Sequence, residues 1–211
     1  YDKSLVDHYL EQGIAVMSVE YRLVPEGGKH PEAIRDCMHN LHWLTDHAAE
    51  YRFDTSRIVL QGSSAGSYLA MMLGLTSERN EFQPDFGPYQ NRKVRVKAAI
   101  SSAAMYDWTA ITKGGEYIGT YRDSLDASPV NLARSGNCRH FLLLGGDSDT
   151  NWSPPGSARL MQSNLEAAGK SCELHLRTNQ THPALYDDFE EYSKWALPVI
   201  DAFLKEYVLL K

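Results

Sequence analysis

The sequence predicts an α/β fold with a mostly parallel β-sheet and helices on both of its faces. Strand-like and helix-like segments alternate along the 211 residues. The strand-like segments are short, apolar and rich in β-branched residues, and the segments between them have apolar residues at helical spacing. Strands separated by helices form βαβ units, whose right-handed crossovers distribute helices over both faces. We therefore expect one domain over residues 1–211, with a small cap or loop insertion at about 105–139.

Five segments are expected to be β-strands. The first reads GIAVMSVEYR and is long and apolar enough for a buried strand. The later segments include SRIVLQG, HFLLLGGD and CELHLRT, which share this β-branched or apolar character. The five cover residues 13–22, 56–62, 94–104, 140–147 and 172–178.

Helical patterns are expected before, between and after these strands. They cover residues 30–51, 64–75, 157–169 and the stretch from about 187 to the end. Pro31 suits the first turn of its helix, whereas Pro198 is expected to kink or split the last one. Residues 1–13 resemble the middle of a helix, so we expect the chain to begin inside a longer protein.

Composition excludes several classes of function. The net charge of −6 argues against a nucleic-acid-binding or anionic-membrane surface. The apolar stretches are shorter than the roughly 18 residues that a membrane span needs. The three cysteines are far apart and show no zinc-binding spacing, so buried thiols in a reducing compartment, with the cytoplasm slightly favoured, are the expectation. The sequence does not determine the oligomeric state.

The segment Gly62-Ser63-Ser64-Ala65-Gly66 fits the pattern G-x-S-x-G with Ser64 at its centre. An expected strand precedes it and an expected helix follows it, which is the context of a nucleophile elbow. Such a turn exposes the serine hydroxyl at the sheet edge, and the following N–H, that of Ala65, faces the reacting oxygen. Ser63 and Ser67 do not occupy the central position. The alternative interpretation is an ordinary Gly/Ser-rich turn.

A nucleophilic serine needs a base and an orienting acid, which in such sheets follow in the order Ser, acid, His. The segment LLLGGDSDTNW offers Asp149 and, as the alternative, Asp147 just after a strand. We prefer Asp149, because it lies farther into the loop. His182 follows the next strand in a polar loop and is the expected base, whereas His175 alternates with leucines inside that strand.

No metal or cofactor is expected. His39 and His42 are three residues apart on an expected helix, but no acidic or cysteine partner has comparable spacing, and both oppose the apolar face. The glycosylation patterns at Asn151 and Asn179 lie beside the expected acid and base and are interpreted as chance.

Four segments together carry a family resemblance. They are VEYRLVPEGGKHPEAIRD, SRIVLQGSSAGSYLA, DASPVNLARSGNCRHFLLLGGDSDTNW and THPALYDDF, in this order. The chain resembles, over nearly its whole length, the α/β-hydrolase esterases of the hormone-sensitive-lipase and feruloyl/acetyl-esterase type. The resemblance implies an eight-stranded sheet, no cofactor and hydrolysis of carboxylic esters. It also implies that Ser64 is the nucleophile, Asp149 the acid and His182 the base.

The chain departs from that family at one point. Such esterases have a His-Gly-Gly segment before the strand that corresponds to residues 13–22, and its glycine N–H groups complete the oxyanion hole. The sequence begins after that point, and the EGGKH of residues 26–30 comes too late to replace the segment. We therefore expect that the N-terminal strands are missing and that the natural protein is longer.

The expected function is a serine hydrolase that cleaves short-chain or aromatic acyl esters of small molecules. Trp108 and Trp152, with Tyr117 and Tyr121, are candidates to line the substrate pocket, although packing of a cap would explain them equally well. An arylformamidase-type amide hydrolase would use the same residues. A non-catalytic, hydrolase-like binding module is the alternative from another class.

Overall fold

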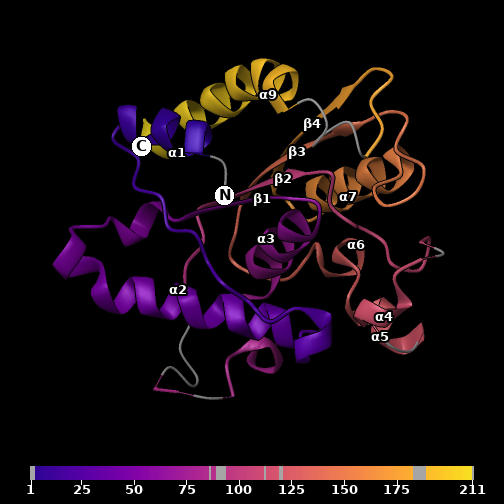
Figure 1. The fold of residues 1–211 in the computed structure, drawn as a ribbon, viewed down its shortest axis with the longest axis horizontal. Helices are drawn as coiled ribbons and strands as arrows, with labels where there is room; N and C mark the ends of the chain where they lie inside the picture. The colour runs from indigo at the N-terminus through magenta and orange to yellow at the C-terminus, as the bar shows by residue number, and fades with distance from the viewer. Residues whose placement is uncertain are drawn as a thin grey trace.

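A four-stranded parallel sheet forms the centre of the structure, a computed structural model (Figure 1). The strands lie in the order β1-β2-β3-β4. Their bounds are β1 Val59–Ser63, β2 Ala98–Ser102, β3 His140–Gly146 and β4 Ser171–Arg177. The structure describes residues 3–85, 87–88, 94–111, 113–118, 121–182 and 189–210.

Helices precede, connect and follow the strands. The α-helices are α1 (Lys3–Glu11), α2 (Glu32–Tyr51), α3 (Ala65–Thr76), α4 (Gly115–Ile118), α5 (Tyr121–Asp126), α6 (Pro129–Leu132), α7 (Pro155–Ala167) and α9 (Phe189–Leu204). Short 3-10 turns are η1 (Val24–Glu26), η2 (Thr55–Arg57) and η3 (Asn80–Phe82), and the π-helical turn η4 covers Lys205–Leu209. The segment between β2 and β3, expected to be a cap, contains α4, α5 and α6; its residues 112, 119 and 120 lie outside the described residues.

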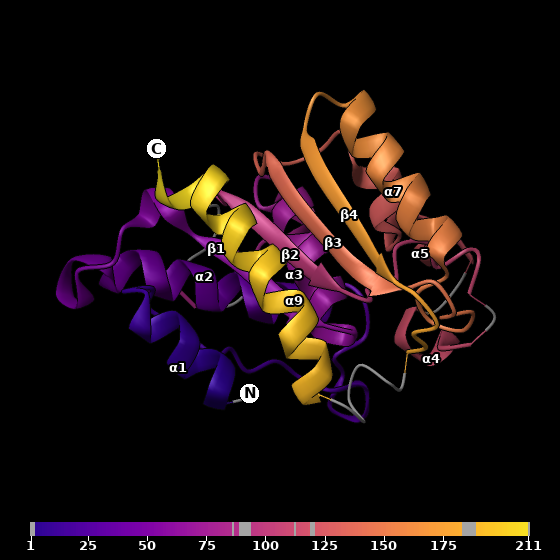
Figure 2. The same cartoon turned by 90° about the horizontal axis from the view of Figure 1, so that it is seen from above.

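The two faces of the sheet bury two separate apolar clusters. Phe141 and Leu143 of β3 face the cluster that includes residues of α2, α3 and α7, whereas Leu142 and Leu144 face the cluster formed with α1 and α9. Successive side chains of a strand point to opposite faces, so an uninterrupted apolar run is what a strand covered on both faces requires. Figure 2 shows α9 crossing one face of the sheet, α3 behind the strands and α7 alongside β4.

The predicted α/β class with a parallel sheet is confirmed, and four of the five expected strands are present. The prediction of a strand at residues 13–22 was wrong for the described chain. A strand exists only when a neighbour shares its hydrogen-bond ladder, and no described strand pairs with this segment. Val16 and Val19, which a sheet would bury, are 42% and 36% exposed.

The last helix is not split at Pro198. α9 continues from Phe189 to Leu204 with the proline inside it. A proline removes one backbone hydrogen bond, but Ala196, Ile200 and Phe203 on the same helix are buried against the sheet. Tertiary packing of an apolar face supplies most of a helix's stability, and here it outweighs the proline. Residues 187 and 188 of the expected helix lie outside the described residues.

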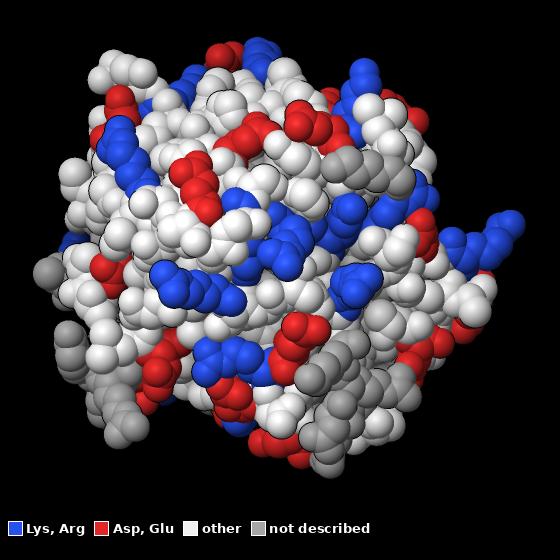
Figure 3. All heavy atoms as spheres, turned by 180° about the vertical axis from the view of Figure 1, so that it is seen from behind, with Lys and Arg blue, Asp and Glu red and all other residues white. Residues whose placement is uncertain are grey.

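The face of the molecule opposite to the one seen in Figure 1 carries both basic and acidic side chains. Lys and Arg side chains gather across the middle of that face, and Asp and Glu side chains lie above and below them (Figure 3). None of the helices formed by the described residues is long and apolar enough to cross a membrane.

Candidate active site

Ser64 lies in a sharp turn between β1 and α3. Its backbone has φ 51° and ψ −115°, a conformation that a residue with a side chain rarely adopts. The Ser64 N–H donates to the carbonyl of Ser102 on β2 at 2.9 Å, and the Ser64 carbonyl accepts from the N–H of Tyr68 at 3.0 Å. The neighbouring strand and the first turn of the helix therefore hold the strained serine from both sides, as a nucleophile elbow requires.

Gly62 permits the close approach of strand and helix. A Cβ atom built on Gly62 would lie 2.2 Å from the carbonyl carbon of Gly66, whereas a Cβ on Gly66 would meet no atom within 4 Å. Of the two glycines of the motif, the contacts therefore require only Gly62 to be small. Gly62 must lack a side chain because the backbone of Gly66 occupies that space.

Ser64, His182 and Asp149 form a continuous line of hydrogen bonds. The Ser64 Oγ lies 2.8 Å from His182 Nε2, and His182 Nδ1 lies 2.6 Å from Asp149 Oδ2. A carboxylate only accepts hydrogen bonds, so Nδ1 carries the proton and Nε2 accepts from the Ser64 hydroxyl. The structure therefore brings together three residues that are separated by up to 118 positions in the sequence.

The side chain of Asp149 is buried, and both of its carboxylate oxygens form hydrogen bonds. It is 1% exposed, and its Oδ1 accepts the N–H groups of Asn151 at 3.3 Å and Trp152 at 3.2 Å in the turn after β3. Burial alone would raise the pKa of this carboxyl. The hydrogen bonds from His182 and from the backbone of Trp152 and Ser153 outweigh burial and hold the pKa below its ordinary value, so the carboxylate stays ionised.

The alternative candidates lie elsewhere. Asp147 is exposed, and its Oδ1 accepts hydrogen bonds from the Asn179 N–H at 2.7 Å and the Ser148 hydroxyl at 2.9 Å. His175 belongs to β4 and lies 3.4 Å from Glu173. Ser67 is buried in a hydrogen bond to Ser101. None of these contacts involves Ser64 or His182.

Ala65 is the first residue of α3. The N–H groups in the first turn of a helix have no partner inside the helix, so the Ala65 N–H is available at the positive end of α3, directly after Ser64. The role of this N–H as an oxyanion donor stays a prediction.

The two candidate pocket tryptophans gather around Gly114. A Cβ on this glycine, whose φ is +82°, would lie 2.9 Å from the Trp152 ring and 3.1 Å from the Trp108 ring. The Tyr117 ring neighbours both tryptophans, with its centroid 6.4 Å from that of Trp108 and 6.5 Å from that of Trp152. Trp108 is buried and Trp152 partly buried. The side chain of Tyr121, a further candidate, lies outside the described residues.

Tyr68 and His30 extend this aromatic cluster and were not singled out from the sequence. The Tyr68 ring packs edge-on against Trp108 at 5.6 Å, and its hydroxyl lies 3.2 Å from His30 Nδ1. Burial lowers the pKa of His30 to about 4, so the ring is neutral at pH 7. Tyr68 could have been found because it follows Ser64 by four residues on a helix. His30 could not, since it lies before α2.

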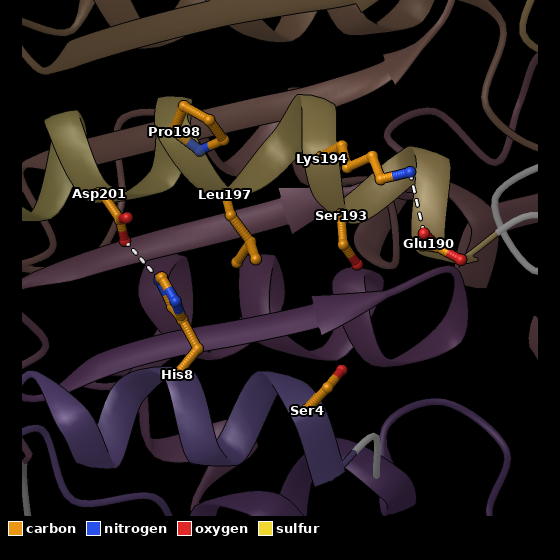
Figure 4. Close-up of a pocket in the computed structure, with 8 residues that line it drawn as sticks. All are labelled: Ser4, His8, Glu190, Ser193, Lys194, Leu197, Pro198 and Asp201. Atoms are coloured by element: carbon orange, nitrogen blue, oxygen red, sulfur yellow. Dashed lines mark hydrogen bonds and ion pairs between the residues drawn. The ribbon is translucent and has the colours of Figure 1, made fainter.

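A hollow of about 450 Å³ lies between α1 and α9 (Figure 4). Its lining residues are Ser4 and His8 of α1 and Glu190, Ser193, Lys194, Leu197, Pro198 and Asp201 of α9. His8 Nε2 contacts Asp201 at 2.9 Å across it. Ser64, Asp149 and His182 are not among the lining residues, so this hollow is separate from the site.

The histidines of α2 do not form a metal site in the described part of the chain, where no cluster of three potential ligands occurs. The expectation that His42 opposes the apolar face was wrong. His42 is fully buried, and its Nε2 lies 2.9 Å from the side-chain oxygen of Gln83. A polar partner on a distant segment, directly after η3, allows the helix to bury this histidine.

The parallel sheet, the strained serine turn and the Ser-His-Asp line of hydrogen bonds define the α/β-hydrolase class. Esterase 2 of Thermogutta terrifontis superposes with a TM-score of 0.79 at 24% identity, covering 96% of this chain and 75% of that one. An acetyl ester-xyloside bifunctional hydrolase from Caldicellulosiruptor lactoaceticus gives 0.80 at 17% identity, covering 97% and 76%. These likenesses confirm the α/β-hydrolase fold.

The family model BD-FAE matches residues 1–160, and the chain belongs to this family. Among curated proteins of Mycobacterium tuberculosis, the probable carboxylic ester hydrolase LipM is 33% identical over 161 residues, covering 69% of this chain and 36% of LipM. Esterase LipQ is 24% identical over 194 residues, covering 85% and 45%. The chain thus spans less than half the length of these two relatives.

Proposed function

We propose that this protein is a serine hydrolase that cleaves carboxylic esters through an acyl-enzyme on Ser64. The observation that carries the proposal is the line of hydrogen bonds from Ser64 Oγ to His182 at 2.8 Å and from His182 to Asp149 at 2.6 Å. The names of the relatives, a probable carboxylic ester hydrolase and an esterase, support the same reaction class.

In this mechanism His182 Nε2 accepts the Ser64 proton while Oγ attacks the ester carbonyl. The tetrahedral intermediate collapses, the ester C–O bond breaks, and His182 returns the proton to the departing alcohol. Water then attacks the acyl-enzyme, with His182 again accepting a proton, and the carboxylic acid leaves as Ser64 regains its hydrogen. No cofactor takes part in these steps.

Asp149 and Ala65 stabilise the charges that arise on the way. The carboxylate of Asp149 stays ionised because its pKa is held below the ordinary value, and it faces the imidazolium that forms on His182. Because Asp149 is buried, this attraction is stronger than it would be in water. The Ala65 N–H is the oxyanion donor that we assign within the described residues. Loss of one such donor costs on the order of 100- to 1,000-fold in kcat.

A phosphonate-ester probe tests the nucleophile directly. The intact protein should gain the mass of one phosphonyl group, because the probe traps an activated serine, and the Ser64→Ala variant should gain nothing. Intact-mass spectrometry before and after treatment gives the answer. Equal labelling of both proteins would remove Ser64 from its role. Folded wild-type protein that takes up no probe would favour the non-catalytic binding module.

We further propose that Trp108 and Trp152 border the acyl pocket and that the substrates are short-chain or aromatic acyl esters. The Trp152 N–H donates to Asp149, and the Trp108 ring packs on Tyr68, one turn after Ser64. The tryptophan cluster is therefore tied both to the acid and to the nucleophile helix. Aromatic rings of this size offer a large apolar surface to an acyl group.

Replacing Trp152 by alanine should change selectivity more than chemistry. The variant keeps the backbone N–H on Asp149 but loses the ring, so kcat/KM should fall about tenfold more for a benzoyl ester than for the acetyl ester of the same alcohol. Trp43→Ala is the control, because Trp43 stacks on His47 of α2, away from the cluster. An equal loss for both esters would contradict the pocket assignment. The same assay with an N-formyl aromatic amide examines the arylformamidase alternative.

A further inference from the structure

The contact between His182 and Asp149 depends on two separate loops. Asp149 lies three residues beyond the end of β3, and His182 lies five residues beyond the end of β4. These strands are parallel neighbours whose last paired residues are Gly146 and Arg177. The ladder therefore ends before either side chain is reached, and something beyond it must fix the distance between the loops.

Asp147 and its neighbours continue the connection past the ladder. The Asp147 N–H donates to the Arg177 carbonyl at 3.1 Å, and the Ser148 N–H donates to the Gln180 carbonyl at 3.1 Å. The Asp147 side chain adds a third bond across the two loops, since its Oδ1 accepts the Asn179 N–H at 2.7 Å. Of these three links, the Asp147–Asn179 bond alone uses a side chain, and it is the shortest.

Two further features show that the loops are held closely. Asn179 has φ +58°, a left-handed conformation that asparagine adopts more readily than most other residues with a side chain. A Cβ on Gly146 would lie 2.0 Å from the Gln180 carbonyl oxygen, so the loop after β4 lies directly on the backbone of β3. The Asp147 carboxylate therefore binds the backbone of the His182 loop at this left-handed residue, three residues before His182.

We propose that Asp147 is a positioning residue, whose carboxylate holds the His182 loop against the Asp149 loop and so sets the His182–Asp149 contact. The inference rests on the proposed function for its effect on rate. Within the described residues, the Asp147 side chain bonds to Asn179 and Ser148 and not to the reacting atoms. Its carboxylate restrains the position of the His182 loop. This matters because a displacement of about 1 Å at a catalytic group can lower the rate 100-fold.

The test compares Asp147→Ala with Asp147→Asn in the intact protein. Alanine should lower kcat about 10- to 100-fold on an acetyl ester with KM nearly unchanged, because the transition state depends on His182 more than substrate binding does. Asparagine should restore most of the lost kcat, since its side-chain oxygen can still accept the Asn179 N–H. Proton NMR should show the low-field His182 Nδ1–H signal in the wild type and in Asp147→Asn, and a broadened or missing signal in Asp147→Ala.

Asp54→Ala is a matched control. Asp54 is also exposed, and its Oδ1 likewise accepts a backbone N–H and a serine hydroxyl, both from Ser56, before β1. The kcat of Asp54→Ala should stay within about twofold of the wild-type value. A wild-type kcat and NMR signal in Asp147→Ala, or an equal loss in Asp54→Ala, would overturn the proposal. If the wild-type protein cleaves no ester, the proposed function fails, and the NMR signal alone decides the role of Asp147.

Discussion

Replacing Asp149 by asparagine is expected to lower kcat by about 10⁴-fold while the protein stays folded. An asparagine can present its NH₂ group to His182 Nδ1, which then acts as the acceptor, and the imidazole takes the tautomer that cannot accept the Ser64 proton. The site would also lose the negative charge that stabilises the imidazolium. Steady-state kinetics on an acetyl ester measure the loss of kcat, and circular dichroism of the same sample shows whether the variant is folded.

The pH dependence of stability provides an independent check on Asp149. Its folded pKa lies below the ordinary value of 3.8. Its ionised form therefore stabilises the folded chain above that ordinary pKa, and the contribution is lost as the pH falls through the lower, folded pKa. In urea titrations, the stability of Asp149→Asn should lack this part of the dependence on acid pH.

For the kinetic prediction, an Asp149→Asn variant with wild-type kcat would be the contradicting result, and it would favour Asp147 as the acid.

Replacing Gly62 by alanine is expected to destabilise the protein by about 3 kcal/mol or more and to remove most of its activity. The added Cβ would lie 2.2 Å from the backbone of Gly66, so β1 and α3 must move apart and the Ser64 turn must change. Urea unfolding and phosphonate labelling of the folded fraction measure the two effects.

Gly66→Ala is the matched comparison for stability. Its Cβ would meet no atom within 4 Å, and alanine is favoured over glycine inside a helix by about 1 kcal/mol. The midpoint of urea unfolding should therefore stay the same or rise. Equal destabilisation by Gly62→Ala and Gly66→Ala would contradict the prediction, because it would show that the close contact at Gly62 does not determine which substitution the turn tolerates.

Local chemistry explains why most of the fold and the core of the site could be predicted. The run HFLLLGG is apolar at every buried position of β3, so its sequence indicates a central strand without further information. Ser64 is predictable because glycines, strand and helix all surround it in sequence. Asp149 and His182 follow from chain order, since parallel strands bring their carboxyl ends to one edge.

What could not be predicted depends on contacts between distant segments. The apolar pattern at residues 13–22 specifies a strand only where a neighbour pairs with it, and none among the described residues does. His42 can be buried because the side-chain oxygen of Gln83, on a different segment, accepts a hydrogen bond from its Nε2. The role of Asp147 likewise depends on Asn179, 32 residues later, and no local pattern indicates that pairing.

The arrangement of the candidate site over three strand ends has a consequence for how the chain would acquire the activity that we propose. Ser64 follows β1, Asp149 follows β3 and His182 follows β4, so their mutual distances depend on the register of the whole sheet. A slip of one residue in any ladder moves a strand end by about 3.3 Å, more than the length of either hydrogen bond. Partly folded chains with one misregistered strand therefore cannot activate the serine. Under the proposed mechanism, labelling of Ser64 would therefore indicate a correctly assembled sheet, because Ser64 becomes reactive only after the last strand has joined the sheet.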